Sequence, residues 1–318
     1  MWTIKPHGYV VSLPDFYIDR IVKIESFDKL SDVIKSKLYS GGSIRGIEQR
    51  EIKGGNATNI AYALSMLGMR CVLITAADEY GKGILENTFA NLDAKLIIKN
   101  GKQGYTTSFE TKQTNIMISD SGINEKFSTS MLSDEDLSII KGANAIAITN
   151  WASNICANEL IEDIFSISNG SLHFLDPADI SERKDEFVLM LKRYSDLIDV
   201  LSINENEGAI LAKSLGIEID KHLALKIAKE FNIRVDLHTQ TYSASSNGSY
   251  EEIVDTFKVD AKIFTGAGDV WDAADILAYL ADLEASKRLL FANAAAAYYV
   301  QNVKVPKMDD VLNIIEVL

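Results

Sequence analysis

The chain has 318 residues, of which 47% are hydrophobic and 24% are charged, so it can build a folded core and is not a disordered polymer. Its 45 acidic residues outnumber the 32 Lys and Arg residues, and the net charge of −13 repels phosphate backbones. No apolar run approaches the ~20 residues of a membrane span, and the first residues lack the apolar region of a secretory signal. We therefore expect a cytoplasmic protein without nucleic-acid or membrane partners.

Short apolar segments alternate with segments of helical periodicity along most of the chain. Strands are expected at residues 9–13, 71–74, 145–148, 172–175 and 200–203, and helices at 59–67, 83–92, 158–167, 186–194 and 207–215. Continuous apolar strands between amphipathic helices indicate a parallel sheet that is covered on both faces. The sequence therefore predicts a doubly wound α/β fold, with residues 1–318 in a single domain.

Two stretches, residues 15–53 and 105–119, depart from this alternation. The first contains strand-like pieces at 18–24 and 46–52, with a short helix expected at 26–38 between them. The second is rich in Thr and β-branched residues, as in a β-hairpin. Together the two stretches predict a small β-sheet lid at one edge of the α/β body.

The segment Thr265-Gly266-Ala267-Gly268-Asp269 precedes a helical run. Glycines at the start of a helix let the backbone approach a ligand closely, and the first N–H groups of the helix attract anions. Asp269 is a candidate catalytic carboxylate. The alternative is that its side chain only caps the helix.

A second cluster, Gly54-Gly55-Asn56-Ala57-Thr58-Asn59, opens the helix that is expected to end at residue 67. Two glycines and two amide side chains at a helix start can present hydrogen-bonding groups to the hydroxyls of a sugar. The alternative is a glycine turn in which Asn59 is a cap or a first-turn residue.

Together the two clusters resemble the GGxxxN and TGAGD motifs of the ribokinase-like (PfkB) family of carbohydrate kinases, in the expected order and separation. Three further segments extend the resemblance. Tyr17-Ile18-Asp19 is similar to the segment whose Asp binds sugar hydroxyls, and Asn204-Glu205-Asn206-Glu207 is similar to the NxxE motif near the metal and the phosphates. Residues 291–297 resemble the Ala-rich helix beside the nucleotide base. The five landmarks span residues 17–297.

The resemblance implies a three-layer α/β/α fold with a β-sheet lid, and transfer of the γ-phosphoryl group of ATP to a hydroxyl of a sugar, sugar derivative or polyol. By resemblance, Asp269 is the general base, and the Gly266, Ala267 and Gly268 amides form the anion hole.

The resemblance also assigns the remaining site residues. Those expected to bind the acceptor are Asp19, Gly54, Gly55 and Asn59. Those expected to bind the nucleotide are Asn204, Thr239, Thr265, Gly266, Gly268 and Asn293. Mg²⁺ is expected on the nucleotide phosphates, with Asn204 and Glu207 acting through its water shell.

Three segments depart from the family pattern. Lys262-Ile263-Phe264 replaces the usual polar lead-in to TGAGD. Gln240 and Ser243 stand where glycines are expected in the nucleotide turn of residues 238–244. Gln301-Asn302-Val303-Lys304 replaces a Gly-Ala turn that bears on activation by a monovalent cation.

Several alternatives therefore stay open. The acceptor can be a nucleoside, the donor ADP or another nucleotide, and a catalytically inactive relative that senses a ligand is a third possibility. The unpaired edges and apolar face of the lid predict a homodimer.

Overall fold

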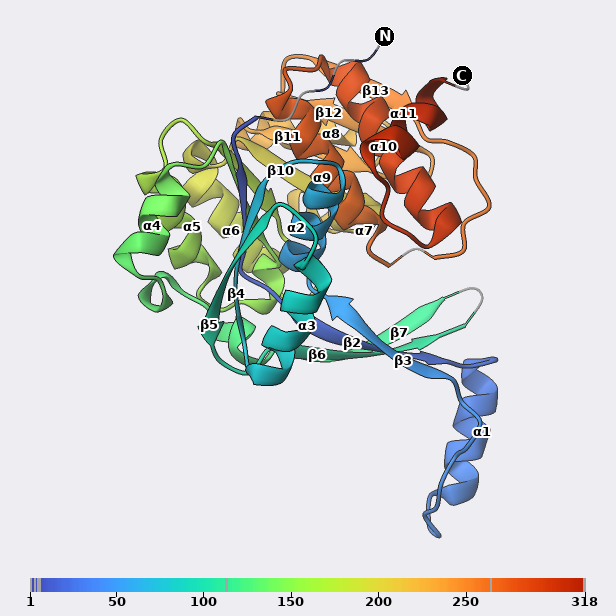
Figure 1. The fold of residues 1–318 in the computed structure, drawn as a ribbon. Coiled ribbons are helices and arrows are strands. Elements are labelled where there is room, and N and C mark those ends of the chain that lie inside the picture. Colours follow the sequence, from blue (N-terminus) through green and yellow to red (C-terminus); the bar gives the residue numbers. More distant parts are fainter. Residues whose placement is uncertain (1, 3, 5–6, 112–113, 264, 317–318) are drawn as a thin grey trace.

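The computed structural model describes residues 2, 4, 7–111, 114–263 and 265–316. A nine-stranded sheet runs through the centre of the molecule (Figure 1). The strand order is β13-β12-β11-β10-β9-β8-β1-β4-β5. In that order the strands are Glu251–Asp255, Tyr242–Ser246, Arg234–His238, Val200–Asn204, Leu172–Asp176, Ala145–Thr149, Val10–Leu13, Cys71–Ala77 and Ala94–Asn100.

The strands from β11 to β5 are all parallel to their neighbours, and β12 and β13 add an antiparallel hairpin at one edge. Strand β1 lies between β8 and β4, where Val11 pairs with Ile146 on one side and with Val72 on the other. Both faces of β1 are buried, and its one polar residue, Ser12, donates its hydroxyl hydrogen to the Ala57 carbonyl oxygen.

Helices cover both faces of this sheet, so the predicted three-layer α/β/α architecture is confirmed. One core cluster packs against α4 (Asp134–Lys141), α5 (Ala157–Ile167), α6 (Lys184–Tyr194), α7 (Glu205–Leu215) and α8 (Leu223–Phe231). The other packs against α2 (Asn56–Met66), α3 (Glu79–Phe89), α9 (Ala267–Leu280), α10 (Ala285–Asn302) and α11 (Met308–Glu316). Consecutive residues of β1 alternate between them, since Val11 belongs to the first cluster and Val10 to the second.

The starts of two helices differ from the prediction. Helix α2 begins at Asn56, three residues before the expected start, because the Asp15 carboxylate accepts hydrogen bonds from the amides of Asn56 and Ala57. Helix α3 begins at Glu79 because the Asp78 side chain caps it by accepting from the Gly81 amide. In both cases a carboxylate satisfies the first amides, and the apolar pattern contains no trace of that interaction.

A second, four-stranded sheet has the order β3-β2-β6-β7, with strands Gln49–Gly54, Tyr17–Lys23, Gly104–Glu110 and Asn115–Asp120. Strands β2 and β6 are parallel, and the two outer pairings are antiparallel. The strands expected within residues 15–53 and 105–119 are therefore confirmed, although residues 112–113 lie outside the described part of the chain.

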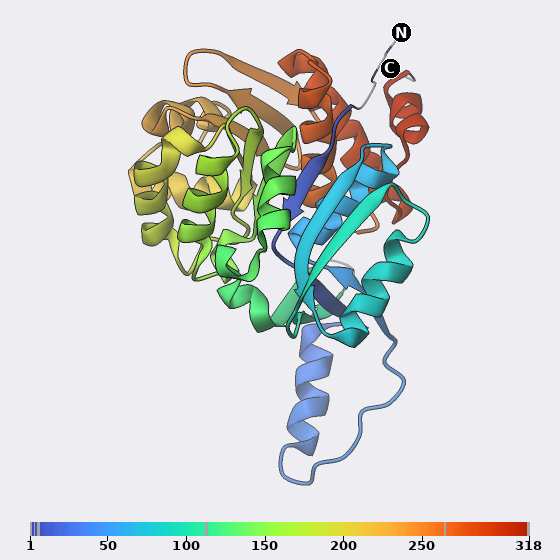
Figure 2. The same ribbon diagram turned by 60° about the vertical axis from the view of Figure 1, so that its left-hand side comes forward.

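Helix α1 (Phe27–Lys37) joins β2 to β3 and projects away from the body, as Figures 1 and 2 show. The Ser26 side chain caps it by accepting from the Lys29 amide. None of its residues is buried. The helix expected at 26–38 is therefore present, and its apolar residues belong to neither core cluster.

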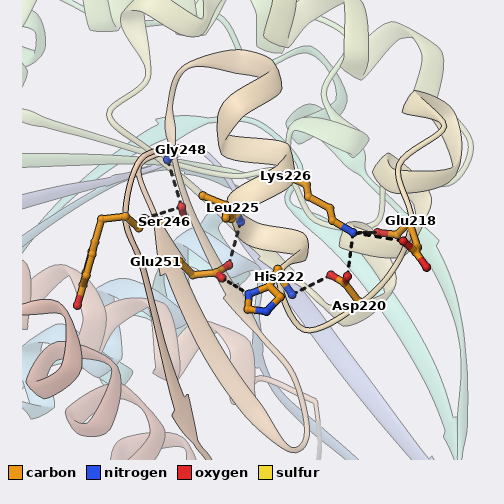
Figure 3. A network of polar contacts seen from close by, with 9 residues as sticks. Glu218, Asp220, His222, Leu225, Lys226, Ser246, Gly248 and Glu251 are labelled. Carbon is orange, nitrogen blue, oxygen red and sulfur yellow. Dashed lines mark hydrogen bonds and ion pairs between the residues drawn. The ribbon is translucent and has the colours of Figure 1, made fainter.

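The hairpin β12–β13 is anchored to α8 by the network in Figure 3. The Glu251 carboxylate accepts from the Leu225 amide at 3.0 Å and contacts His222 Nδ1 at 2.6 Å.

None of the helices in the described part of the chain combines the length and apolar character that crossing a bilayer requires.

Candidate active site

A cavity of about 1140 Å³ opens at the carboxyl ends of the parallel strands, where the four-stranded sheet meets the main body. Ligands of open α/β sheets bind at this edge. The sequence-predicted residues that line the cavity are Asp19, Gly55, Asn59, Asn204, Thr239, Thr265, Gly266, Ala267, Gly268, Asp269 and Asn293. Gly54 and Glu207 were also expected in the site, but neither is among the described residues that line the cavity.

The N-terminus of α9 forms one wall. Gly266 is the N-cap residue, with a left-handed φ of 82°, and a Cβ atom there would lie 2.9 Å from the Tyr299 hydroxyl oxygen. The position therefore needs glycine for its backbone conformation and for its close neighbour. The first amides of a helix have no partner within the helix, so those of Ala267 and Gly268 are available to an anion in the cavity.

Asp269 is the third residue of α9, so it is not the N-cap that the alternative interpretation required. Its Oδ2 accepts a hydrogen bond from Asn59 Nδ2 at 2.8 Å, which joins the two sequence motifs across 210 residues. Burial and the nearby Asp176 carboxylate raise the pKa of Asp269, whereas the Asn59 hydrogen bond and the Lys53 ammonium lower it.

Asp19 on β2 also lines the cavity, beside Thr106 on β6. Burial raises the pKa of Asp19 to about 6, although hydrogen bonding to Thr106 and the charge of Lys53 oppose this. Gly54 makes room for the carboxylate, because a Cβ atom at Gly54 would lie 2.1 Å from Asp19 Oδ2. The structure therefore corrects the expected direct contact of Gly54: the residue shapes the site from behind Asp19.

Gly55 is held in an unusual conformation, with a φ of 94°, and a Cβ atom there would lie 2.8 Å from the Asp15 carbonyl oxygen. Asp15 is a site-forming residue that the sequence reasoning missed. Besides the two α2 amides, its carboxylate accepts from Thr149 at 2.6 Å and from Asn150 at 3.1 Å. It thereby ties the start of α2 to the end of β8. Its place directly after the first strand was the available signal.

A further missed pair links Asn56 to Asp176. Asn56 Nδ2 donates to Asp176 Oδ2 at 3.0 Å, so the first residue of α2 contacts the last residue of β9. Burial raises the pKa of Asp176 to about 6, to which the Asp15 charge also contributes. Asp15 and Asp176 are buried and are not among the described residues that line the cavity, so they support its wall from behind.

Asn204 and Glu207 form a capping box at the start of α7. Asn204 Oδ1 accepts from the amides of Asn206 and Glu207, while both Glu207 carboxylate oxygens accept from Asn204. Burial raises the pKa of Glu207, and the Asp176 charge raises it further. Glu207 is thus placed behind Asn204 rather than at the cavity surface.

The other expected nucleotide residues have fixed side chains. Asn293 accepts from Trp271 Nε1 at 2.8 Å, and Thr239 Oγ1 donates to the Tyr242 carbonyl oxygen at 2.7 Å. Thr265 Oγ1 accepts from Asn115 of β7 at 3.2 Å, so the four-stranded sheet contacts the loop before α9.

The departures from the family pattern also have a structural setting. Gln240 lines the cavity, whereas Ser243 is buried within β12. Phe264 lies outside the described residues. His238 lines the cavity beside Trp271, and burial lowers its pKa to about 4, so its imidazole is uncharged at neutral pH.

A helix N-terminus and a buried carboxylate face one cavity here, under a second sheet, at the carboxyl edge of a doubly wound body. This combination of fold and site defines a small-molecule phosphotransferase class. A family model described as pfkB family carbohydrate kinase matches residues 22–307. The chain therefore belongs to the pfkB family of carbohydrate kinases, the ATP-dependent enzymes that phosphorylate an alcohol group.

Similar proteins are consistent with that membership. The ribokinase of Bacillus subtilis (strain 168) is 27% identical over 282 residues, which cover 82% of this chain and 85% of the relative. The structure of Arabidopsis thaliana ribokinase complexed with ribose and ATP has a TM-score of 0.78 at 20% identity, covering 98% of this chain and 99% of that one. Methanocaldococcus jannaschii nucleoside kinase has a TM-score of 0.70 at 17% identity, with the same coverage.

Proposed function

We propose that this cavity transfers the γ-phosphoryl group of ATP to a hydroxyl of a sugar, sugar derivative or polyol, with Asp269 as the general base. The observation that carries the proposal is the hydrogen bond between Asp269 and Asn59. It places the proposed base next to the proposed acceptor-binding residues and, through α9, next to a row of helix amides.

The acceptor occupies the end of the cavity between Asp19 and Asn59 in this proposal. A carboxylate accepts hydrogen bonds from hydroxyls, and an amide both donates and accepts, so the pair suits a polyhydroxylated ligand. Gly55 belongs to the same wall, and Gly54 supports it by leaving space for Asp19. Acceptor hydroxyls bonded to buried groups give strong selectivity, because an analogue without the hydroxyl leaves those groups unpaired.

Asp269 takes the proton of the attacking hydroxyl. Asn59 already donates to Oδ2 of the carboxylate, so we assign the acceptor hydroxyl to Oδ1. Proton transfer to a positioned carboxylate contributes roughly 10²–10⁴-fold to a rate. The amides of Gly266, Ala267 and Gly268 then stabilise charge on the transferred phosphoryl oxygens.

The donor lies along α9 and α10, with Asn204, Thr239, Thr265 and Asn293 around it, and enters as its magnesium complex. Both carboxylate oxygens of Glu207 accept hydrogen bonds from Asn204, so Glu207 does not ligate the ion directly and the magnesium ion stays on the phosphates. Within the described residues, no group of three or more His, Cys, Asp or Glu is arranged as a metal cage. Mg²⁺ keeps several of its waters, and Asn204 with Glu207 would act on that shell.

Residues 15–53 and 105–119 act as the lid of this site in our proposal. Their strands supply Asp19, Thr106 and Ser119 to the cavity wall, and Asn115 reaches the loop before α9. We also propose that residues 1–318 form a single domain, which is supported by the core cluster that Val10 of β1 shares with α9 to α11. A cytoplasmic location, where ATP is available as donor, is part of the same proposal.

A homodimer through the lid is part of the proposal. Of the fifteen large hydrophobic side chains that are exposed in the described chain, nine belong to the lid and its helix α1. They are Val33, Ile34, Leu38, Tyr39, Ile44, Ile52, Ile116, Met117 and Ile118. Such a concentration marks a protein interface rather than the normal scatter of apolar surface residues.

A panel assay tests the proposal. D-ribose, D-fructose, myo-inositol and adenosine are each incubated with ATP and Mg²⁺, and the phosphorylated product is detected by mass spectrometry. Phosphorylation of a sugar or polyol supports the proposal, whereas adenosine as sole substrate supports the nucleoside kinase alternative. Binding of a panel member by calorimetry without any product supports the ligand-sensing alternative.

A further inference from the structure

Lys53 is a partly buried cation next to the proposed base, and neither sequence motif includes it. It is the penultimate residue of β3, directly before the two glycines. Its Nζ lies 2.5 Å from Asn59 Oδ1 and 4.6 Å from the ring centroid of Tyr62. Lys53 is partly buried, and the burial of a charged group costs free energy unless the charge is paired and hydrogen-bonded.

We propose that Lys53 is a positioning residue of the phosphoryl-transfer site, which fixes the Asn59 amide so that its N–H groups face Asp269 and the acceptor. This inference rests on the proposed function. Asn59 and Asp269 come from the two sequence motifs, and Lys53 adds a residue of the lid sheet to this pair. The three residues connect β3, α2 and α9.

The hydrogen-bonding capacity of the three side chains supports the assignment. A protonated lysine only donates, so the Asn59 atom facing it must be the oxygen. The nitrogen of the same amide then faces Asp269, where it donates at 2.8 Å. If Lys53 were absent, the amide could rotate and turn its oxygen toward the carboxylate, which would remove the hydrogen bond to the base.

The charges around Lys53 support the same role. The charges of Asp19 on β2 and Asp269 on α9 attract the Lys53 ammonium group. Asn59 and Tyr62, both on α2, contact the same group. Its positive charge lowers the pKa of each carboxylate against the larger effect of burial. Burial in turn lowers the pKa of Lys53 to about 8, and the two carboxylates oppose that decrease. The cation therefore favours the ionised base as well as the amide orientation.

Substitution of Lys53 by Met, which keeps the length and removes the charge and the donor, tests the proposal. In the panel assay we expect kcat to fall by about 10–100-fold with ATP KM unchanged, and the acid limb of the kcat profile to move to higher pH. Lys53→Arg should recover part of kcat and return the acid limb toward the wild-type position. Lys23→Met is the matched control, because Lys23 lies in the same sheet and forms an exposed ion pair with Glu48.

Coupling to Asn59 separates positioning from packing. If Lys53 acts through Asn59, Lys53→Met should cost little in an Asn59→Ala background, whereas a purely structural lysine gives additive losses. The proposal would be overturned if Lys53→Met left kcat and the acid limb unchanged. It would also be overturned if the loss of activity were fully explained by a lower melting temperature of the variant.

A second readout does not depend on activity. In protein labelled with [γ-¹³C]aspartate, the Asp269 resonance is identified by its disappearance in Asp269→Asn and titrated by NMR. Lys53→Met should raise the pKa of Asp269, whereas Lys23→Met should leave it in place. If the pKa of Asp269 does not shift in Lys53→Met, the inference is refuted, whatever the activity of the wild-type chain. If the wild-type chain phosphorylates no panel member, the proposed function is refuted separately.

Discussion

Gly54→Ala probes the acceptor end by moving Asp19 without altering its chemistry. The added Cβ would lie 2.1 Å from Oδ2, 2.3 Å from Cγ and 2.4 Å from Oδ1 of Asp19, whereas ordinary van der Waals contact begins at 3.4 Å. The carboxylate must therefore retreat by about 1 Å or rotate away. A displacement of ~1 Å in a positioning group can cost ~10²-fold in rate. We expect kcat/KM for the acceptor to fall by ~10–10²-fold.

The assay compares steady-state kinetics for acceptor and ATP in the same variant. The acceptor KM should rise, while the ATP KM stays at the wild-type value because Asp19 is not among the proposed donor-binding residues. Gly83→Ala is the control, since a Cβ there meets nothing within 4 Å inside helix α3. It should leave both KM values unchanged and add about 0.5–1 kcal/mol of stability. A wild-type acceptor KM in Gly54→Ala would show that Asp19 does not bind the acceptor.

Three further predictions concern Asp19 and the lid. The pKa of Asp19 is about 6 in the folded chain and 3.8 in the unfolded chain, so ionisation of Asp19 destabilises the fold increasingly as the pH rises from about 4 to 6. Asp19→Asn should therefore raise the free energy of unfolding at pH 7 by up to roughly 3 kcal/mol. Urea titrations should show that this gain disappears below about pH 4. Hydrogen exchange in 15–53 and 105–119 should slow when the acceptor binds, and protection confined to residues 239–300 would contradict their assignment as the lid. Ile118→Lys should convert the proposed dimer to a monomer in light scattering, whereas a wild-type mass would exclude β7 from the interface.

The α/β body was predictable because its central strands are buried on both faces. Segments such as 71–74 and 145–148 are continuously apolar, and amphipathic helices lie between the strands, so local pattern and tertiary role agree. The helix starts were less accessible. Asp15 caps α2 from 41 residues away, and no local pattern at Asn56 records that contact.

The candidate site divides in the same way. Gly266 and Gly55 have backbone conformations that favour glycine, so their motifs are visible in the sequence. Lys53 resembles any surface lysine of a lid strand until the fold brings Asn59 and Asp269 to it. Glu207 fitted a metal-associated motif, yet the structure shows that its carboxylate caps α7. Roles that depend on partners distant in sequence could not be predicted from spacing.

The most direct test of the account is the turnover of Asp269→Asn with the best acceptor of the panel. Asn preserves the size of the side chain and leaves Gly266 as the cap of α9. We predict that kcat falls by roughly 10²–10⁴-fold while ATP affinity stays near the wild-type value, because a general base acts as the proton leaves and not in ground-state binding. A variant with wild-type kcat would contradict the account, because the proposed transfer would then have no base at Asp269.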